Sequence, residues 1–159
     1  MVLGGTRSGK SEVAERIVAT LPAPVIYVAT ATGGGDADLD ARIARHRDRR
    51  PPEWTTVESQ HDLPETLTSL TGSVLVDSVG AWIADHIDFS ADVDGLCQAC
   101  LARDGDTVLV AEEVGLSVHP PTEIGRRFVD ALGECNRRLA DVADQALLVV
   151  AGRTLELGR

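Results

Sequence analysis

Lysine is almost absent from this chain of 159 residues, and basic residues as a whole are in deficit. The 15 Lys and Arg residues face 25 Asp and Glu residues, which gives a formal net charge of −10. A non-specific grip on nucleic acid requires a surplus of basic side chains that face the phosphates. This charge balance therefore excludes nucleic acid as an expected partner. The single lysine is Lys10, and every other basic residue is arginine.

Long apolar runs and paired cysteine motifs are missing as well. No stretch approaches the ~20 apolar residues that a membrane span needs, and Arg7 and Lys10 interrupt the first apolar run where a signal peptide would continue. We therefore expect no membrane span and a cytoplasmic location. Cys97, Cys100 and Cys135 lack the second CxxC pair of a zinc site, so we expect three reduced thiols. The CxxC spacing of the first two leaves a redox-active pair as the alternative.

The residues that are present favour one folded domain. Hydrophobic residues make up 43% of the sequence and charged residues 25%, which is typical of a globular protein. A chain of this length buries about 70% of the surface that it exposes when unfolded, which is enough for a core without disulfides or metals. We expect a single catalytic domain over residues 1–159.

Short β-branched runs alternate along the chain with longer segments of helical period. This alternation is typical of βαβ units around a mainly parallel sheet, so it predicts an α/β fold. The predicted strands are residues 1–3, 24–30, 54–58, 73–78, 107–111 and 146–150. The predicted helical segments are residues 11–21, 36–49, 63–70, 79–103 and 122–143.

A glycine-rich stretch lies between the first predicted strand and the first predicted helix. It reads Gly4-Gly5-Thr6-Arg7-Ser8-Gly9-Lys10-Ser11 and matches the GxxxxGK[ST] pattern of a phosphate-binding loop. Glycines let backbone N–H groups wrap around phosphates, and the following helix adds the positive end of its dipole. We expect Lys10 to reach the β- and γ-phosphates and the Ser11 hydroxyl to ligate Mg²⁺. The pattern predicts a P-loop NTPase (RecA-like) three-layer fold, with a plain glycine turn as the alternative.

Carboxylates end two of the later strands. Asp77 follows Val74-Leu75-Val76 and would emerge near the phosphate loop at the carboxyl edge of the sheet, where a second metal ligand is needed. A helix N-cap or turn residue is the alternative role for Asp77. Glu112 and Glu113 end the next strand in the same way and compete for the metal role.

His46 lies in the second predicted helix, three residues after Ile43. This spacing alone predicts a half-buried histidine on the inner helix face. Its neighbours favour another role, because five of the chain's 14 arginines lie within nine residues around it. They are Arg42, Arg45, Arg47, Arg49 and Arg50. Guanidinium groups hold phosphate oxygens in bidentate fashion, so the cluster indicates a polyphosphate site.

Taken in order, these motifs resemble the bifunctional adenosylcobinamide kinase and adenosylcobinamide-phosphate guanylyltransferase family of cobalamin biosynthesis. The resemblance spans nearly the whole chain. Beyond the phosphate loop it is carried by Tyr27-Val28-Ala29-Thr30, by residues 42–51 with His46 and Pro51, by Trp54-Thr55 with Glu58, and by Glu113-Val114-Gly115.

The resemblance implies a two-step enzyme. The terminal phosphate of ATP or GTP would first go to the hydroxyl of the aminopropanol arm of adenosylcobinamide, a corrinoid. His46 would then attack the α-phosphate of GTP, expel pyrophosphate, and pass GMP to the new phosphate to give adenosylcobinamide-GDP. The resemblance also implies a homo-oligomer, and the phosphate-loop pattern already predicts Mg²⁺ as the cofactor of the nucleotide.

Site residues follow from the resemblance position by position. His46 and Lys10 would be catalytic, and Ser11 and Asp77 would hold the metal. Nucleotide contacts would come from Gly4, Gly5, Thr6, Arg7, Ser8, Gly9, Lys10, Ser11, Ala29, Thr30, Ala31, Arg47, Asp48, Arg49, Arg50, Glu58 and Asp77.

The chain departs from the family pattern at a few positions. Asp77-Ser78 stands where Glu-Cys is frequent, Glu112 stands where Asn is frequent, and Gly152-Arg153-Thr154 differs from the usual apolar ending. The main alternative is a monofunctional P-loop kinase for a small molecule, with a structural His46. A GTP-dependent switch commonly needs an Asn-Lys-x-Asp loop, which a chain with Lys10 as its sole lysine cannot form. A binding protein without catalysis is a third possibility.

Overall fold

The computed structural model describes residues 1–31 and 37–158, except for the side chains of residues 37–40 and 42. Its central element is a seven-stranded sheet with the strand order β3-β2-β4-β5-β1-β6-β7. The strands are β1 (Val2–Gly4), β2 (Val25–Ala29), β3 (Thr55–Glu58), β4 (Ser73–Asp77), β5 (Thr107–Glu112), β6 (Ala146–Val150) and β7 (Arg153–Leu157). Neighbours from β3 to β6 pair in parallel, and β7 alone runs antiparallel to β6. The mainly parallel sheet confirms the predicted α/β fold.

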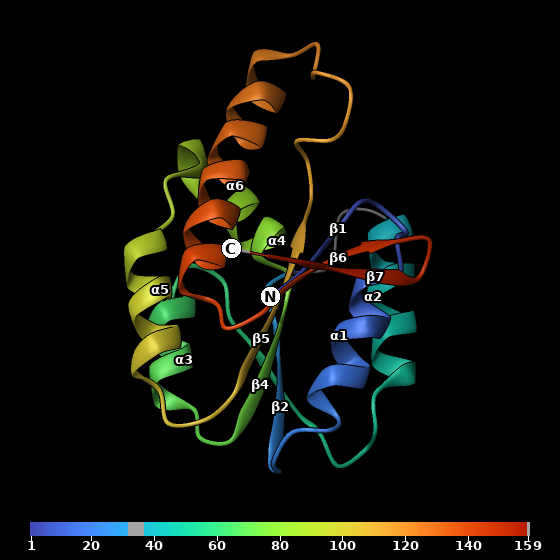
Figure 1. Ribbon diagram of the computed structural model, residues 1–159, viewed down its shortest axis with the longest axis vertical. Coiled ribbons are helices and arrows are strands. Elements are labelled where there is room, and N and C mark those ends of the chain that lie inside the picture. Colours follow the sequence, from blue (N-terminus) through green and yellow to red (C-terminus); the bar gives the residue numbers. More distant parts are fainter. Residues whose placement is uncertain (32–36, 159) are drawn as a thin grey trace.

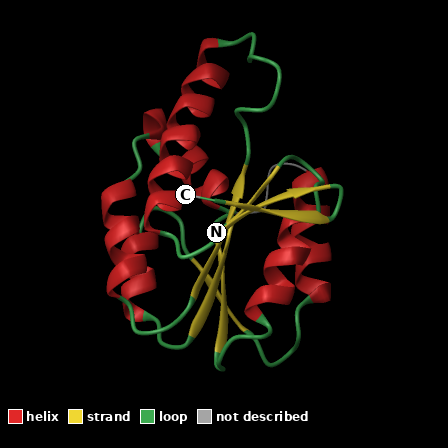
Figure 2. Ribbon diagram, in the orientation of Figure 1, coloured by secondary structure: helices red, strands yellow, loops and turns green. Residues whose placement is uncertain are grey.

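Helices cover both faces of this sheet (Figure 1). They are α1 (Lys10–Val18), α2 (Ala37–Arg49), α3 (Leu63–Ser69), α4 (Val79–Asp85), α5 (Val93–Ala102) and α6 (Glu123–Val142), with a 3-10 helix η1 (Ile87–Phe89). Figure 2 shows α1 and α2 on one side of the strands and the remaining helices on the other. The arrangement has the three layers that the sequence predicts. The predicted start of the second helix at Asp36 lies outside the described residues.

The core consists of two clusters, one on each face of the sheet. On one face, Leu67 and Trp82 pack with Val74 and Val76 of β4, and on the other Val18 packs with Leu75 of the same strand. Successive side chains of a strand point to opposite faces, so a strand buried on both faces is apolar throughout. This explains why β4 is a continuous apolar run in the sequence. Among the described helices, none is both long enough and apolar enough to cross a membrane.

The prediction of one helical segment over residues 79–103 was wrong. That stretch divides into α4, η1 and α5. Asp88 and Phe89 adopt positive φ angles of 58° and 60°, which a continuing α-helix does not allow. Asp92 then starts α5 afresh, because its side chain accepts a hydrogen bond from the Gly95 N–H at 2.8 Å.

The sequence analysis also missed β7. This strand is exposed along its whole length, so it lacks the buried apolar run that marks the other strands. It is joined to β6 by a two-residue turn at Ala151 and Gly152, whose φ angles are 51° and 74°. The Gly152 N–H donates to the Ser8 carbonyl oxygen at 2.7 Å. Through this hydrogen bond the hairpin turn contacts the predicted phosphate loop next to the start of α1 (Figure 1).

Candidate active site

The predicted phosphate loop lies where β1 ends at Gly4 and α1 begins at Lys10. Its backbone is tightly folded, and two of its glycines, Gly4 and Gly9, are required. A Cβ on Gly4 would lie 2.4 Å from Ser8 Oγ, and Gly9 has a φ of 92°. The side chain of Lys10 is only 8% exposed, and its Nζ lies 3.5 Å from both the Gly5 carbonyl oxygen and Glu112 Oε1. The ammonium group is thus held inside the loop.

The carboxylate nearest to this ammonium group comes from β5. Glu112 pairs in register with Gly4, because β5 is the direct neighbour of β1. Its Oε2 accepts a hydrogen bond from Ser78 Oγ at 3.2 Å. Glu113 points elsewhere, since its Oε1 accepts from the Gly115 N–H at 2.6 Å. Of the two competing glutamates, only Glu112 faces the phosphate loop.

Asp77 ends β4, one strand further from the loop. Its Oδ2 accepts a hydrogen bond from Tyr27 OH at 3.0 Å and lies 3.5 Å from His46 Nδ1. Helix α4 is capped by Ser78, which accepts from the Ala81 N–H, so Asp77 does not serve as the N-cap. A cis peptide bond joins Asp77 to Ser78. The two contacts of Oδ2 show that the Asp77 carboxylate faces His46.

His46 reaches this site from α2, and its side chain is 25% exposed. Besides Asp77, its Nδ1 lies 3.7 Å from Glu15 Oε1 and 3.3 Å from Arg49 Nη2. Burial acts to raise the pKa of Glu15, but its hydrogen bonds to His46 and Arg49 outweigh this effect and lower that pKa. Glu15 is therefore a carboxylate at neutral pH, with its charge directed at the histidine and arginine of α2.

Two adjoining hollows join His46 to the phosphate loop. The larger has a volume of about 310 Å³ and the other about 270 Å³, and Lys10, Ser11 and His46 line both. The larger hollow also brings together five more predicted or competing site residues. They are Ala29, Ala31, Arg50, Asp77 and Glu112. The second hollow adds others from the loop and from α2. They are Arg7, Ser8, Gly9, Arg45 and Arg49.

Two of the clustered arginines hold α2 in place. Arg49 Nη1 lies 2.9 Å from Glu12 Oε1, and its Nη2 lies 3.0 Å from Glu15 Oε1. The guanidinium of Arg50 lies 3.3 Å from the centre of the Tyr27 ring, a cation–π contact. These contacts tie the helix that carries His46 to α1 and β2.

Seven predicted contact residues do not line the hollows: Gly4, Gly5, Thr6, Thr30, Arg47, Asp48 and Glu58. The Thr30 hydroxyl donates to the Ser78 carbonyl oxygen at 2.7 Å and accepts from the Ser78 N–H at 2.8 Å. Arg47 and Asp48 are exposed on α2, and Glu58 is exposed at the end of β3. Nucleotide binding by these residues stays a prediction, as it does for the residues that line the hollows.

Comparison with known proteins identifies the family. A family model described as "Cobinamide kinase / cobinamide phosphate guanyltransferase" matches residues 1–157. The chain belongs to this family.

Relatives of the chain are similar to it over nearly their full length. A protein of Pseudomonas aeruginosa named "Bifunctional adenosylcobalamin biosynthesis protein CobP" is 38% identical over 166 residues, which cover 99% of this chain and 95% of the relative. Proteins named "Bifunctional adenosylcobalamin biosynthesis protein CobU" from Escherichia coli and Salmonella typhimurium are each 33% identical over 174 residues, covering 96% of this chain and 95% of either relative. The resemblance found in the sequence motifs is thereby confirmed.

In this member of the cobinamide kinase and guanyltransferase family, sequence reasoning missed two neighbours of His46. Glu15 lies within the first predicted helix and was given no role. Tyr27 entered as a family motif residue without a role. Both contact partners that lie far away in the sequence, so no local pattern signals these roles.

The described residues contain no group of three or more His, Cys, Asp or Glu side chains arranged to hold a metal ion. Mg²⁺ is commonly bound by one or two protein oxygen ligands together with substrate phosphates. The Ser11 hydroxyl and the Asp77 and Glu112 carboxylates supply oxygen donors of that kind around the larger hollow. These residues fit the predicted ion.

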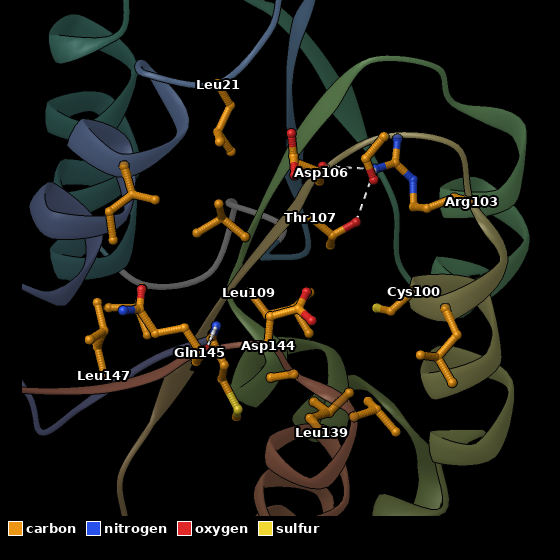
Figure 3. A pocket seen from close by; sticks show the side chains of 18 residues that line it. Leu21, Cys100, Arg103, Asp106, Thr107, Leu109, Leu139, Asp144, Gln145 and Leu147 are labelled. Atoms are coloured by element: carbon orange, nitrogen blue, oxygen red, sulfur yellow. Dashed lines mark hydrogen bonds between the residues drawn. The ribbon is translucent and has the colours of Figure 1, made fainter. Parts of the chain in front are cut away.

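Another cavity, of about 410 Å³, lies at the opposite edge of the sheet, where β1, β5 and β6 begin (Figure 3). The Arg103 guanidinium there donates to backbone carbonyl oxygens, among them those of Gly72 and Asp106, both at 2.8 Å. Burial raises the pKa of the Cys100 thiol to about 11, so this thiol is protonated at neutral pH.

Proposed function

We propose that this protein phosphorylates adenosylcobinamide with ATP or GTP and then transfers GMP from GTP to the product, giving adenosylcobinamide-GDP. Support comes from the family description, which pairs a kinase with a guanyltransferase. The relatives' names describe bifunctional proteins of adenosylcobalamin biosynthesis, which favours two activities over a kinase alone.

One observation carries the proposal: His46 and Lys10 line the same hollows. A phosphate-binding lysine alone suits any P-loop kinase. A histidine facing the same space adds a nucleophile within reach of a bound nucleotide's phosphates. Splitting a transfer into two covalent steps is what such a nucleophile permits.

In the kinase step, Lys10 and the backbone N–H groups of the loop would hold the β- and γ-phosphates while the substrate hydroxyl attacks the γ-phosphorus. Phosphoryl transfer is catalysed mainly by positioning and by stabilising charge on the phosphate oxygens. Bound Mg²⁺ would neutralise charge on the phosphates, held by Ser11 and Asp77 with Glu112 as the competing ligand.

In the guanylyl step, the same loop would hold the β- and γ-phosphates as the leaving pyrophosphate. His46 would then face the α-phosphorus from α2, with arginines of that helix near the developing charge. One nucleotide position thus serves both reactions, since the two differ in which phosphorus is attacked.

The proposal extends to the whole chain and its assembly. We treat residues 1–159 as one catalytic domain, and we propose a homo-oligomer, as the family resemblance implies. Sedimentation of the purified protein over a range of concentrations tests the assembly.

His46→Ala separates the two activities. The variant should retain phosphorylation of adenosylcobinamide, because Lys10 and the loop are intact, and it should lose formation of adenosylcobinamide-GDP. His61→Ala, which removes an exposed histidine outside the hollows, should retain both. Both products can be followed by chromatography of the corrinoid. A His46→Ala enzyme that still forms adenosylcobinamide-GDP would refute the covalent route.

A further inference from the structure

We infer that Nε2 of His46 is the atom that attacks the α-phosphorus, and that Asp77 and Glu15 position the ring by holding its Nδ1. This inference rests on the proposed guanylyl transfer and adds two positioning residues and a choice of nitrogen to it.

The surroundings of Nδ1 exclude it as the attacking atom. Three side-chain atoms lie within 3.7 Å of it: Asp77 Oδ2 at 3.5 Å, Glu15 Oε1 at 3.7 Å and Arg49 Nη2 at 3.3 Å. A phosphorus atom with its oxygens has no room between these groups, and two of the three are carboxylates that repel phosphate. Nε2 forms no hydrogen bond or ion pair with any described residue.

Two carboxylates at Nδ1 also select the tautomer. A neutral imidazole carries one proton, and the nitrogen without it is the nucleophile. Asp77 and Glu15 favour the proton on Nδ1, which leaves the lone pair on Nε2. Arg49 favours the opposite tautomer, because its Nη2 lies 3.3 Å from Nδ1 and can only donate. We infer that the two carboxylates, at 3.5 and 3.7 Å, outweigh this single donor.

Asp77 is itself held in place for this task. Tyr27 OH donates to the same Oδ2 that faces His46. The Tyr27 side chain is buried, and the contact of Arg50 with its ring fixes the tyrosine from the other side.

The chemistry balances with this assignment. The Nε2 lone pair forms a bond to the α-phosphorus as the bond from that phosphorus to the bridging oxygen breaks, and pyrophosphate leaves with the electron pair. The imidazole becomes positively charged and keeps its proton on Nδ1, facing Asp77 and Glu15. When a phosphate oxygen of the acceptor attacks, the phosphorus–Nε2 bond breaks and returns the pair to the ring. The carboxylates stabilise the charge between the two displacements.

The first test identifies the nitrogen. Wild-type protein is incubated with GTP and Mg²⁺, and the adduct is studied by NMR correlation of phosphorus with the ring protons of His46. Phosphorus on Nε2 couples to both ring protons, whereas phosphorus on Nδ1 couples to Hε1 alone. Coupling to both supports the inference. Coupling to Hε1 alone overturns it but leaves the guanylyl transfer standing, and an absence of any adduct refutes the proposed function itself.

The second test addresses the positioning residues. Asp77→Asn should slow enzyme guanylylation at saturating GTP by ~10–100-fold, as loss of a carboxylate partner of a working histidine commonly does. Asp85→Asn is the matched control, because Asp85 Oδ2 lies 3.5 Å from Nε2 of another histidine, His61. That control should react at the wild-type rate. Equal rates in the two variants would overturn the role of Asp77.

Asp77 is also a predicted metal ligand, so Asp77→Asn alters both the contact with His46 and the metal site. A variant that keeps the carboxylate is therefore needed. Tyr27→Phe leaves the carboxylate intact and removes only the hydrogen bond that orients it. We expect guanylylation to slow more than the kinase step, because the lost hydrogen bond orients the Asp77 oxygen that faces His46. Glu15→Gln should also slow guanylylation, and by more than Glu12→Gln does. Both glutamates bind Arg49, but only Glu15 contacts His46. Effects confined to GTP affinity, or equal in the two glutamate variants, would contradict the inference.

Discussion

At the scale of single residues, the position of Glu112 depends on the absence of a side chain at Gly80. A Cβ there would lie 1.9 Å from Glu112 Oε2. The carboxylate ends a flexible side chain, so it would rotate away rather than unfold the protein. Glu112 would then lose its contacts with Lys10 Nζ and Ser78 Oγ. The glycine at position 80 is therefore needed by the site, to leave room for the Glu112 carboxylate, and not by helix α4.

Gly80→Ala should therefore lower the kinase rate by about tenfold or more, since small displacements at a reacting centre have large effects. Stability should change little, because alanine favours a helix over glycine by about 1 kcal/mol and offsets the local repacking. Gly133→Ala in α6 is the matched control, because no atom lies within 4 Å of its added Cβ. A kinase rate at the wild-type level in Gly80→Ala would contradict a role for Glu112.

At the scale of elements, charged side chains contribute to the attachment of α2, the helix that carries His46. Arg49 ties α2 to Glu12 and Glu15 of α1, and its side chain is 38% exposed. Partly exposed ion pairs contribute roughly 0–1 kcal/mol and weaken with salt. The hairpin on the other side of the loop is attached by backbone instead, through the Gly152 N–H and the Ser8 carbonyl oxygen.

The hairpin turn offers a test of stability. A two-residue turn with positive φ at both positions is of the type that prefers Asn-Gly, and here Ala151 occupies the first position. Ala151→Asn should raise the free energy of unfolding by roughly 0.5–1 kcal/mol, because alanine is strained in this region. Gly152→Ala should lower it by about 1 kcal/mol or more for the same reason. Urea denaturation measures both, and a destabilised Ala151→Asn protein would refute the assigned turn.

At the scale of the whole molecule, the two core clusters on the faces of the sheet determine the stability of the fold. Leu67 is 0% exposed within the cluster on the α3 face, whereas Leu101 is 59% exposed. Leu67→Ala should lower the free energy of unfolding by about 2–5 kcal/mol, as removal of a buried leucine side chain commonly does. Leu101→Ala should lower it by no more than about 0.5 kcal/mol. Similar midpoints of urea denaturation for the two variants would contradict this assignment of the core.

The parts of this molecule that sequence predicts are those encoded locally. The phosphate loop, the apolar strands and the helix N-capped by Thr122 depend on neighbouring residues, and each lies close to its predicted position. The break at Asp88 and Phe89 and the exposed strand β7 gave no apolar signal. The choice of Glu112 over Glu113 and the pairing of Asp77 with His46 depend on strand register and on α2 packing, which link residues 31 or more positions apart.

The central claim is that GMP passes through His46, and covalent labelling tests it most directly. Protein incubated with GTP labelled at the α-phosphate, then denatured and digested, should carry acid-labile, alkali-stable label on the peptide that contains His46. Adding adenosylcobinamide phosphate before denaturation should move the label to the corrinoid. GTP labelled at the γ-phosphate should leave the enzyme unlabelled. A wild-type enzyme that forms adenosylcobinamide-GDP yet never acquires the α-phosphate label would contradict the account.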